Sequence, residues 1–139
     1  MRTSLVLCAL IAISLWGSAS GGTEAAGCIA SQQRMQQIEL MFGRNIGGRL
    51  GVGEAAWSRF LAREITPRFP DGFTVLDAAG QWRDNERSRP GRERSKLVII
   101  VTADDASVRD KIDTIVIAYK RQFRQRSVGV ISHEVCAAL

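Results

Sequence analysis

Apolar and polar residues alternate over Gln37–Phe42, the first regular segment of the chain. Its apolar positions are Ile38, Leu40 and Phe42, with polar side chains before and between the first two. A period of two predicts a strand with one buried face. Further along, Leu97–Val101 is apolar throughout and rich in β-branched residues, which is typical of a central strand covered on at least one face.

Two more strands complete this pattern. Phe73–Leu76 begins one that extends toward Trp82, and Ser127–Val135 forms the last. Polar residues and turn-forming pairs such as Pro90-Gly91 separate the former from the apolar strand Leu97–Val101. These two strands are therefore predicted to form a hairpin with a long charged tip.

Two segments have the three- and four-residue spacing of amphipathic helices. The first is Glu54–Thr66, which Pro67 ends, and its apolar stripe consists of Trp57, Phe60, Leu61 and Ile65. The second starts after Asp104 or Asp105, either of which can cap it. Its stripe consists of Val108, Ile112, Ile115, Tyr119 and Phe123.

The predicted order of elements is therefore β-α-β-β-α-β. This order favours a ferredoxin-like α+β fold, a four-stranded antiparallel sheet with two helices on one face. In that topology the four strands lie in the order 4-1-3-2, so the end of the last strand lies beside the start of the first. We expect one such domain over residues 35–139.

The N-terminal segment has the layout of a signal peptide. Arg2 precedes the uncharged apolar stretch Ser4–Trp16, and the small residues Gly17–Ser20 follow. This stretch is shorter than the roughly 20 residues that a helix needs to cross a bilayer. A cleaved signal peptide over residues 1–20 is thus favoured over a membrane anchor. We expect an exported protein, periplasmic or secreted, with residues 21–34 as a flexible lead-in.

An alternative lies at Ala25–Cys28, which resembles the cleavage site of a bacterial lipoprotein. The polar residues Thr23 and Glu24 separate it from the apolar stretch, and its first position is not leucine. Lipid anchoring through Cys28 is therefore the less favoured interpretation.

Signal cleavage removes Cys8 and leaves Cys28 and Cys136. An oxidising compartment favours a disulfide between two such cysteines, and the predicted strand order brings them together. Two separate buried thiols are the alternative. Cleavage also leaves 18 basic and 14 acidic residues, a formal charge of +4, which attracts anions weakly and does not identify a nucleic-acid binder. No nucleic-acid partner is expected.

Three segments are more specific than composition. They are Thr66–Asp77 followed by Gly80–Arg83, then Arg92–Lys96, and then Tyr119-Lys120 with Phe123, Gln125, Ser127 and Val128. Through these residues the chain resembles, over roughly residues 36–136, a family of small exported bacterial proteins catalogued as domain of unknown function 3574. The resemblance implies an envelope location and cysteines near both termini. It brings no activity, cofactor or catalytic residue. The hairpin tip and the glycine-rich loop of this chain depart from the family pattern.

Gly51–Ala56 fits the dinucleotide fingerprint G-x-G-x-x-G/A, and Asp77 follows at about the distance expected of the ribose-binding acid. The fingerprint needs an immediate turn from strand to helix, whereas eight residues separate Gly51 from the strand that ends near Phe42. A mobile surface loop is the favoured interpretation.

Trp82, Arg83, Glu93 and Lys96 flank the predicted hairpin and are the candidates for ligand binding in a pocket on the open face of the sheet. Guanidinium and ammonium groups suit a small anionic ligand such as a phosphate or carboxylate. The alternatives are a cross-strand network in which Trp82 covers apolar surface, and a hairpin tip that is simply solvated.

No catalytic residue, cofactor or metal site is predicted. His133 is the only histidine, so it is interpreted as a surface residue. The leading hypothesis is a non-enzymatic ligand-binding or interaction module. The alternative is a small enzyme that uses the open sheet face with Arg83, Glu93 and Lys96, an arrangement that a homodimer enclosing a pocket would favour.

Overall fold

The computed structural model describes residues 27–83 and 89–139. The predicted signal peptide and the centre of the charged hairpin tip lie outside these residues. The main strands are β1 (Gln33–Gly43), β4 (Thr74–Trp82), β5 (Gly91–Thr102) and β6 (Gly129–Ala137). The helices are α1 (Glu54–Phe60), continued by a π-helical turn over Leu61–Ile65, and α2 (Ala106–Phe123). Two short strands, β2 (Asn45–Ile46) and β3 (Arg49–Leu50), precede α1.

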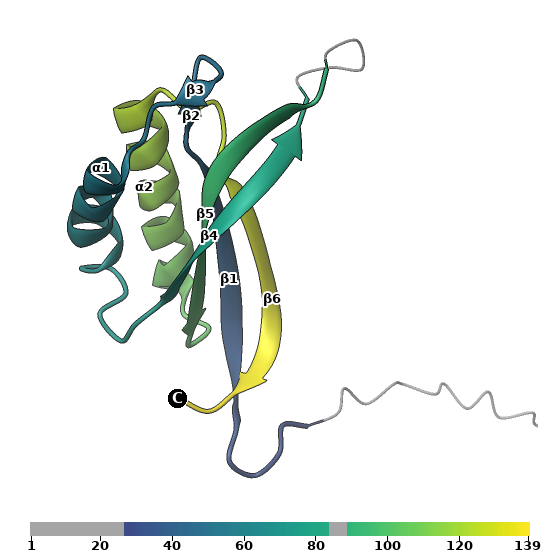
Figure 1. Ribbon diagram of the computed structural model, residues 1–139. Coiled ribbons are helices and arrows are strands. Elements are labelled where there is room, and N and C mark those ends of the chain that lie inside the picture. The colour runs from purple at the N-terminus through teal and green to yellow at the C-terminus, as the bar shows by residue number, and fades with distance from the viewer. Residues whose placement is uncertain (1–26, 84–88) are drawn as a thin grey trace, which may run out of the picture.

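The four long strands form one sheet in the order β4-β5-β1-β6, and every neighbouring pair is antiparallel. This is the strand order predicted from the sequence, read from the opposite edge. Both helices lie on one face of the sheet, and the β4–β5 hairpin extends beyond them (Figure 1). The predicted fold class is thus confirmed.

Alternation along the strands selects the residues that face the helices. Ile38, Leu40 and Phe42 of β1 are buried, and Val98 and Ile100 of β5 are paired beside the first two. Successive side chains of a strand point to opposite faces. The intervening residues therefore point to the other side of the sheet, which none of the described elements covers. We call that side the open face.

Five aromatic rings form the centre of the core between sheet and helices. Phe42 has its ring centroid 4.7 Å from that of Tyr119 and 5.2 Å from that of Trp57. Phe60 and Phe123 complete the group, both in contact with Tyr119. The Tyr119 hydroxyl donates a hydrogen bond to the Gly43 carbonyl oxygen at 2.8 Å. Burial raises the pKa of this phenol, so it remains a neutral donor.

The second helix matches its predicted stripe, because Val108, Ile112, Ile115, Tyr119 and Phe123 are all buried. The Asp105 carboxylate caps it by accepting a hydrogen bond from the Ser107 backbone N–H at 2.6 Å. This bond also lowers the pKa of Asp105. None of the described helices is long and apolar enough to span a membrane.

The first helix differs from its prediction over Glu54–Thr66, because regular α-helix ends at Phe60. The Thr66 backbone N–H donates to the Leu61 carbonyl five residues earlier, at 2.9 Å, which is the spacing of a π-helix. This wider turn lets both Phe60 and Ile65 be completely buried. The apolar spacing identified the buried side chains but did not reveal the widened turn.

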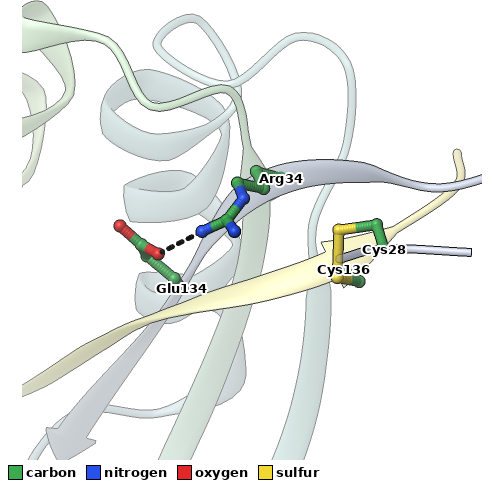
Figure 2. Close-up of a disulfide and its surroundings, with 4 residues drawn as sticks. All are labelled: Cys28, Arg34, Glu134 and Cys136. Atoms are coloured by element: carbon green, nitrogen blue, oxygen red, sulfur yellow. Dashed lines mark hydrogen bonds and ion pairs between the residues drawn. A yellow bond between two sulfur atoms is a disulfide. The ribbon is translucent and has the colours of Figure 1, made fainter. Parts of the chain in front are cut away.

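A disulfide joins Cys28 to Cys136, whose Cα atoms are 5.4 Å apart. Figure 2 shows the bond next to the paired ends of β1 and β6. Beside it, the exposed side chains of Arg34 and Glu134 approach to 3.5 Å, and such an exposed pair contributes little stability. The two cysteines are 108 residues apart in sequence. Closing a loop of that order restricts the unfolded chain by roughly 4.7 kcal/mol in the chain-entropy description.

Replacing Trp57 with alanine should lower the free energy of unfolding by about 3–5 kcal/mol, because a large buried ring is lost and the surrounding rings cannot fully close the cavity. Chemical denaturation measures this change. The matched control is Ile117→Ala on the outer side of α2, where the side chain is 64% exposed and the expected loss is below about 0.5 kcal/mol. Equal losses in both variants would contradict this description of the core.

Candidate functional site

The glycine-rich segment after β1 folds into a small hairpin rather than an open loop. Strands β2 and β3 pair with each other through Asn45 and Leu50, and the turn between them is Gly47-Gly48. Both glycines have positive φ, 60° and 79°, as a two-residue turn of the type I′ kind requires. Val52, which follows the hairpin, is completely buried. A hairpin therefore occupies the place where a dinucleotide fingerprint needs a direct turn from strand to helix.

Arg44 holds this hairpin against the rest of the protein. Its carbonyl oxygen accepts hydrogen bonds from the backbone N–H groups of Gly51 and Val52, and its own N–H donates to the Arg94 carbonyl of β5 at 3.0 Å. Its guanidinium donates to the Val52 carbonyl at 2.8 Å and to Glu54 at the start of α1 at 2.7 Å. The Arg44 side chain is only 4% exposed, and the sequence had given no indication of this role.

Lys96 is the second buried cation of this region. It lies in β5 directly opposite Asp77 of β4. Its ammonium contacts the Asp77 carboxylate, and its Nζ lies 3.0 Å from the carboxylate of Glu54. Arg44 therefore shares Glu54 with Lys96, and its guanidinium lies 4.0 Å from Asp77. Three structural elements meet at this polar network, which we define by Arg44, Glu54, Asp77 and Lys96.

Mutual attraction shifts the pKa values within the polar network. A hydrogen bond from Lys96 lowers the pKa of Glu54 below its ordinary value of 4.5, and Arg44 lowers it further. Lys96 likewise lowers the pKa of Asp77 below 3.8. In return, the hydrogen bond with Asp77 is the main cause that raises the pKa of Lys96 above 10.5, against the opposing effect of its burial. Glu54, Asp77 and Lys96 are therefore charged at neutral pH.

A shallow groove of about 480 Å³ adjoins this network between the β2–β3 hairpin and the β4–β5 hairpin. It is lined by Asn45, Leu50, Ala79, Arg92, Glu93 and Arg94. Arg92 and Arg94 follow the alternation of Lys96 and so point to the helix side of β5. On the helix side of the sheet, the polar network and the groove lining together contribute two carboxylates, Glu54 and Asp77, and four cations, Arg44, Arg92, Arg94 and Lys96. The groove therefore has a net positive charge.

Of the four residues predicted to line a pocket on the open face, the strand register places two there and one on the opposite face. Trp82 and Glu93 follow the alternation of that face, with Trp82 paired to Gly91 and Glu93 paired to Gly80. Lys96 instead points toward the helices with Val98 and Ile100, which corrects its predicted position. Lys96 comes three positions after Glu93 in β5, and an odd offset along a strand assigns the two side chains to opposite faces.

The remaining residues singled out from the sequence are Arg83, His133 and Asp77. Arg83 follows the end of β4 and is exposed. His133 lies exposed in the edge strand β6. Within residues 27–83 and 89–139, no three histidine, cysteine or acidic side chains gather as metal ligands would. Asp77, considered above as a ribose-binding acid, is engaged by Lys96 instead.

Comparison with known proteins shows one family. Residues 37–139 match the family model described as "Protein of unknown function (DUF3574)". No match to the chain was found among curated proteins.

Similar solved structures have low sequence identity to this chain. A phage SAM lyase in complex with S-methyl-5'-thioadenosine has a TM-score of 0.60 at 14% identity, over 76% of this chain and 90% of that one. The phage SAM lyase in its apo state gives 0.57 at 13%, over 83% and 96%. A PII-like signaling protein from Thermus thermophilus gives 0.44 at 13%, over 78% and 93%. At 13–14% identity the likeness to the phage SAM lyase shows the fold alone.

Replacing Lys96 with methionine should weaken the dependence of stability on acid pH. Glu54 and Asp77 have lowered pKa values in the folded protein, so their contribution to stability is complete above their ordinary pKa values. It is lost as the pH falls through the folded-state values. Without Lys96 both shifts shrink, and the loss of unfolding free energy between about pH 5 and pH 2 should become shallower.

Urea denaturation across that pH range measures the effect. Lys120→Met is the matched control, because Lys120 is exposed near the end of α2 and contacts neither carboxylate of the network. An acid profile of Lys96→Met that overlays those of the wild type and of the control would contradict the network as described.

Proposed function

This chain belongs to the family described as Protein of unknown function (DUF3574), and we propose that it is an exported module that binds a small anionic ligand. The observation that carries the proposal is the positively charged groove between the two hairpins. Arg92 and Arg94 extend from β5 on the same side, two residues apart, and both are exposed to solvent. A phosphate or carboxylate between them accepts hydrogen bonds from both guanidinium groups, each of which can bind such an anion with paired hydrogen bonds.

The polar network lies beside the groove and determines which of its charges are accessible. Arg44 and Lys96 are buried, whereas Glu54 and Asp77 are largely exposed, with side chains 65% and 78% accessible. The carboxylates therefore neutralise the two buried cations and leave the two arginines of the groove as its accessible positive charge. Asn45 helps to fix the groove, because its side-chain amide donates to the Arg92 carbonyl oxygen at 3.2 Å. A site with a fixed backbone loses less entropy when a ligand binds.

The alternative of an enzyme acting through Arg83, Glu93 and Lys96 required these residues to converge on the open face. Strand alternation directs Lys96 to the opposite side, so this hypothesis gains no geometric support. The ligand of the phage SAM lyase is likewise not transferred to this chain, since the two share only the fold. The anion-binding proposal rests on the groove.

Export is the second part of the proposal. The segment Ser4–Trp16 has the length and apolarity of a signal peptide core. The bond between Cys28 and Cys136 fits an oxidising compartment. A Cys28 bonded to Cys136 has no thiol for the acylation that the lipoprotein alternative requires, and this supports a cleaved signal peptide.

Inorganic phosphate and succinate should each bind to the groove, and the double variant Arg92→Gln/Arg94→Gln should bind at least about tenfold more weakly. Hydrogen bonds to charged groups contribute roughly 1.5–3 kcal/mol each, and about 1.4 kcal/mol corresponds to a factor of ten. Isothermal titration calorimetry measures the affinity, and amide shifts at Asn45 and Ala79 locate the ligand. Arg121→Gln, an exposed arginine of α2, is the control with unchanged binding. Equal affinity of the double variant and the wild type would exclude the groove.

The exported protein should begin near residue 20 or 21 and contain no free thiol. Intact-mass analysis of protein from the cell envelope gives the N-terminus, and alkylation without reduction gives the thiol count. A Cys136→Ser variant should expose one alkylatable thiol at Cys28 and thus validate the assay. A species that begins at an acylated Cys28, or two free thiols in the wild type, would refute this part of the proposal.

A further inference from the structure

The open face of the sheet exposes large apolar side chains from three of its four strands. They are Met41 at 40%, Leu76 at 45%, Ile131 at 46% and Trp82 at 48%. By alternation from the buried positions of each strand, all four point away from the helices. An isolated exposed apolar residue needs no explanation, whereas a contiguous group marks a surface that binds something.

The register groups Met41, Leu76 and Ile131 around β5, whereas Trp82 lies six positions beyond Leu76 in β4. Leu97 of β5 is paired with Leu76 on one side and with Met41 on the other. Two residues further along β5, Ile99 faces the same way, and Ile131 lies across the sheet from it in β6. An antiparallel sheet that faces water normally alternates apolar and polar residues. Strand β5 here is apolar on both faces over Leu97–Val101.

The basic side chains of the four long strands are absent from the open face. The lysines and arginines within the four described strands are Arg34, Arg92, Arg94 and Lys96. By strand alternation, all four side chains lie on the helix side of the sheet, so none of them points to the open face. The titratable groups of these strands that do are Glu39, Glu93 and His133. Glu39 already accepts a hydrogen bond from the Gln37 side chain on the same face, at 2.9 Å, which reduces the cost of covering it.

We propose that a second copy of this chain docks on the open face, sheet against sheet. The size of the face is sufficient for such a dimer. The four strands have 9 to 12 residues, and at about 4.8 Å between strands and 3.4 Å per residue they cover roughly 600–800 Å². Two copies would then bury roughly 1,200–1,600 Å², the range of stable protein interfaces. A two-fold axis presents the same apolar surface from both sides, while the basic grooves remain on the outer sides.

The full chain should sediment as a dimer, and Leu76→Glu should reduce its association at least about tenfold, because the new carboxylate is buried without a partner. Ile131→Glu, at the opposite edge of the same face, should have the same effect. The matched control is Ile117→Glu, which places the same charge on the exposed outer side of α2 and should leave the dimer intact. Circular dichroism establishes that each variant is folded.

Sedimentation velocity over a range of concentrations distinguishes the outcomes. A wild-type chain that remains monomeric at its highest soluble concentration would overturn the proposal. This result would also be obtained if lipid or another protein, rather than a second copy, occupied the open face. A dimer that persists in both folded variants, Leu76→Glu and Ile131→Glu, would place the interface elsewhere and overturn it as well. Phosphate binding in the groove is measured separately, so either proposal can fail without the other.

Discussion

Two cations are buried at the end of the sheet, and the arrangement around them depends on their being neutralised. Arg44 and Lys96 are almost inaccessible to solvent, and an isolated charge in such a position is very costly. Glu54 from α1 and Asp77 from β4 supply the compensating carboxylates. The start of α1, the β2–β3 hairpin and the β4–β5 pair must therefore be in place together, since each contributes or contacts a member of the polar network. The groove lies where these elements meet, so its shape follows from the same requirement.

The helix stripes and the strand periods were predictable because the polarity of each residue there matches its environment. Ile115 and Tyr119 are apolar at the four-residue spacing of the buried side of α2, and Leu40 is apolar at the two-residue spacing of the buried side of β1. Lys96 was misplaced because a lysine has the polarity of a surface residue, and its burial depends on Glu54 and Asp77, which are distant in sequence. The side of the strand on which Lys96 lies could nevertheless be read from the sequence. Counting back by twos from Ile100 and Val98 leads to Lys96 and to the helix side of β5.

Arg44 was beyond prediction for a different reason. It follows the last periodic residue of β1 and precedes several glycines, a context that favours a loop. What fixes it is a set of backbone hydrogen bonds with Gly51, Val52 and Arg94. Neither composition nor periodicity reports such bonds. The strand order, by contrast, followed from the order of the elements along the chain, and with it came the proximity of Cys28 and Cys136.

The polar network also connects the two faces of the sheet. Side chains alternate with a period of two, so slipping β4 or β5 by one residue would exchange its faces. The pair of Asp77 and Lys96 opposes such a slip, because a shifted Lys96 would lose both carboxylates and Leu97 would turn toward the helices. Keeping the cations on the helix side is thus the same constraint that keeps Leu97 and Ile99 on the open face. The charged groove and the apolar face are two results of one strand register.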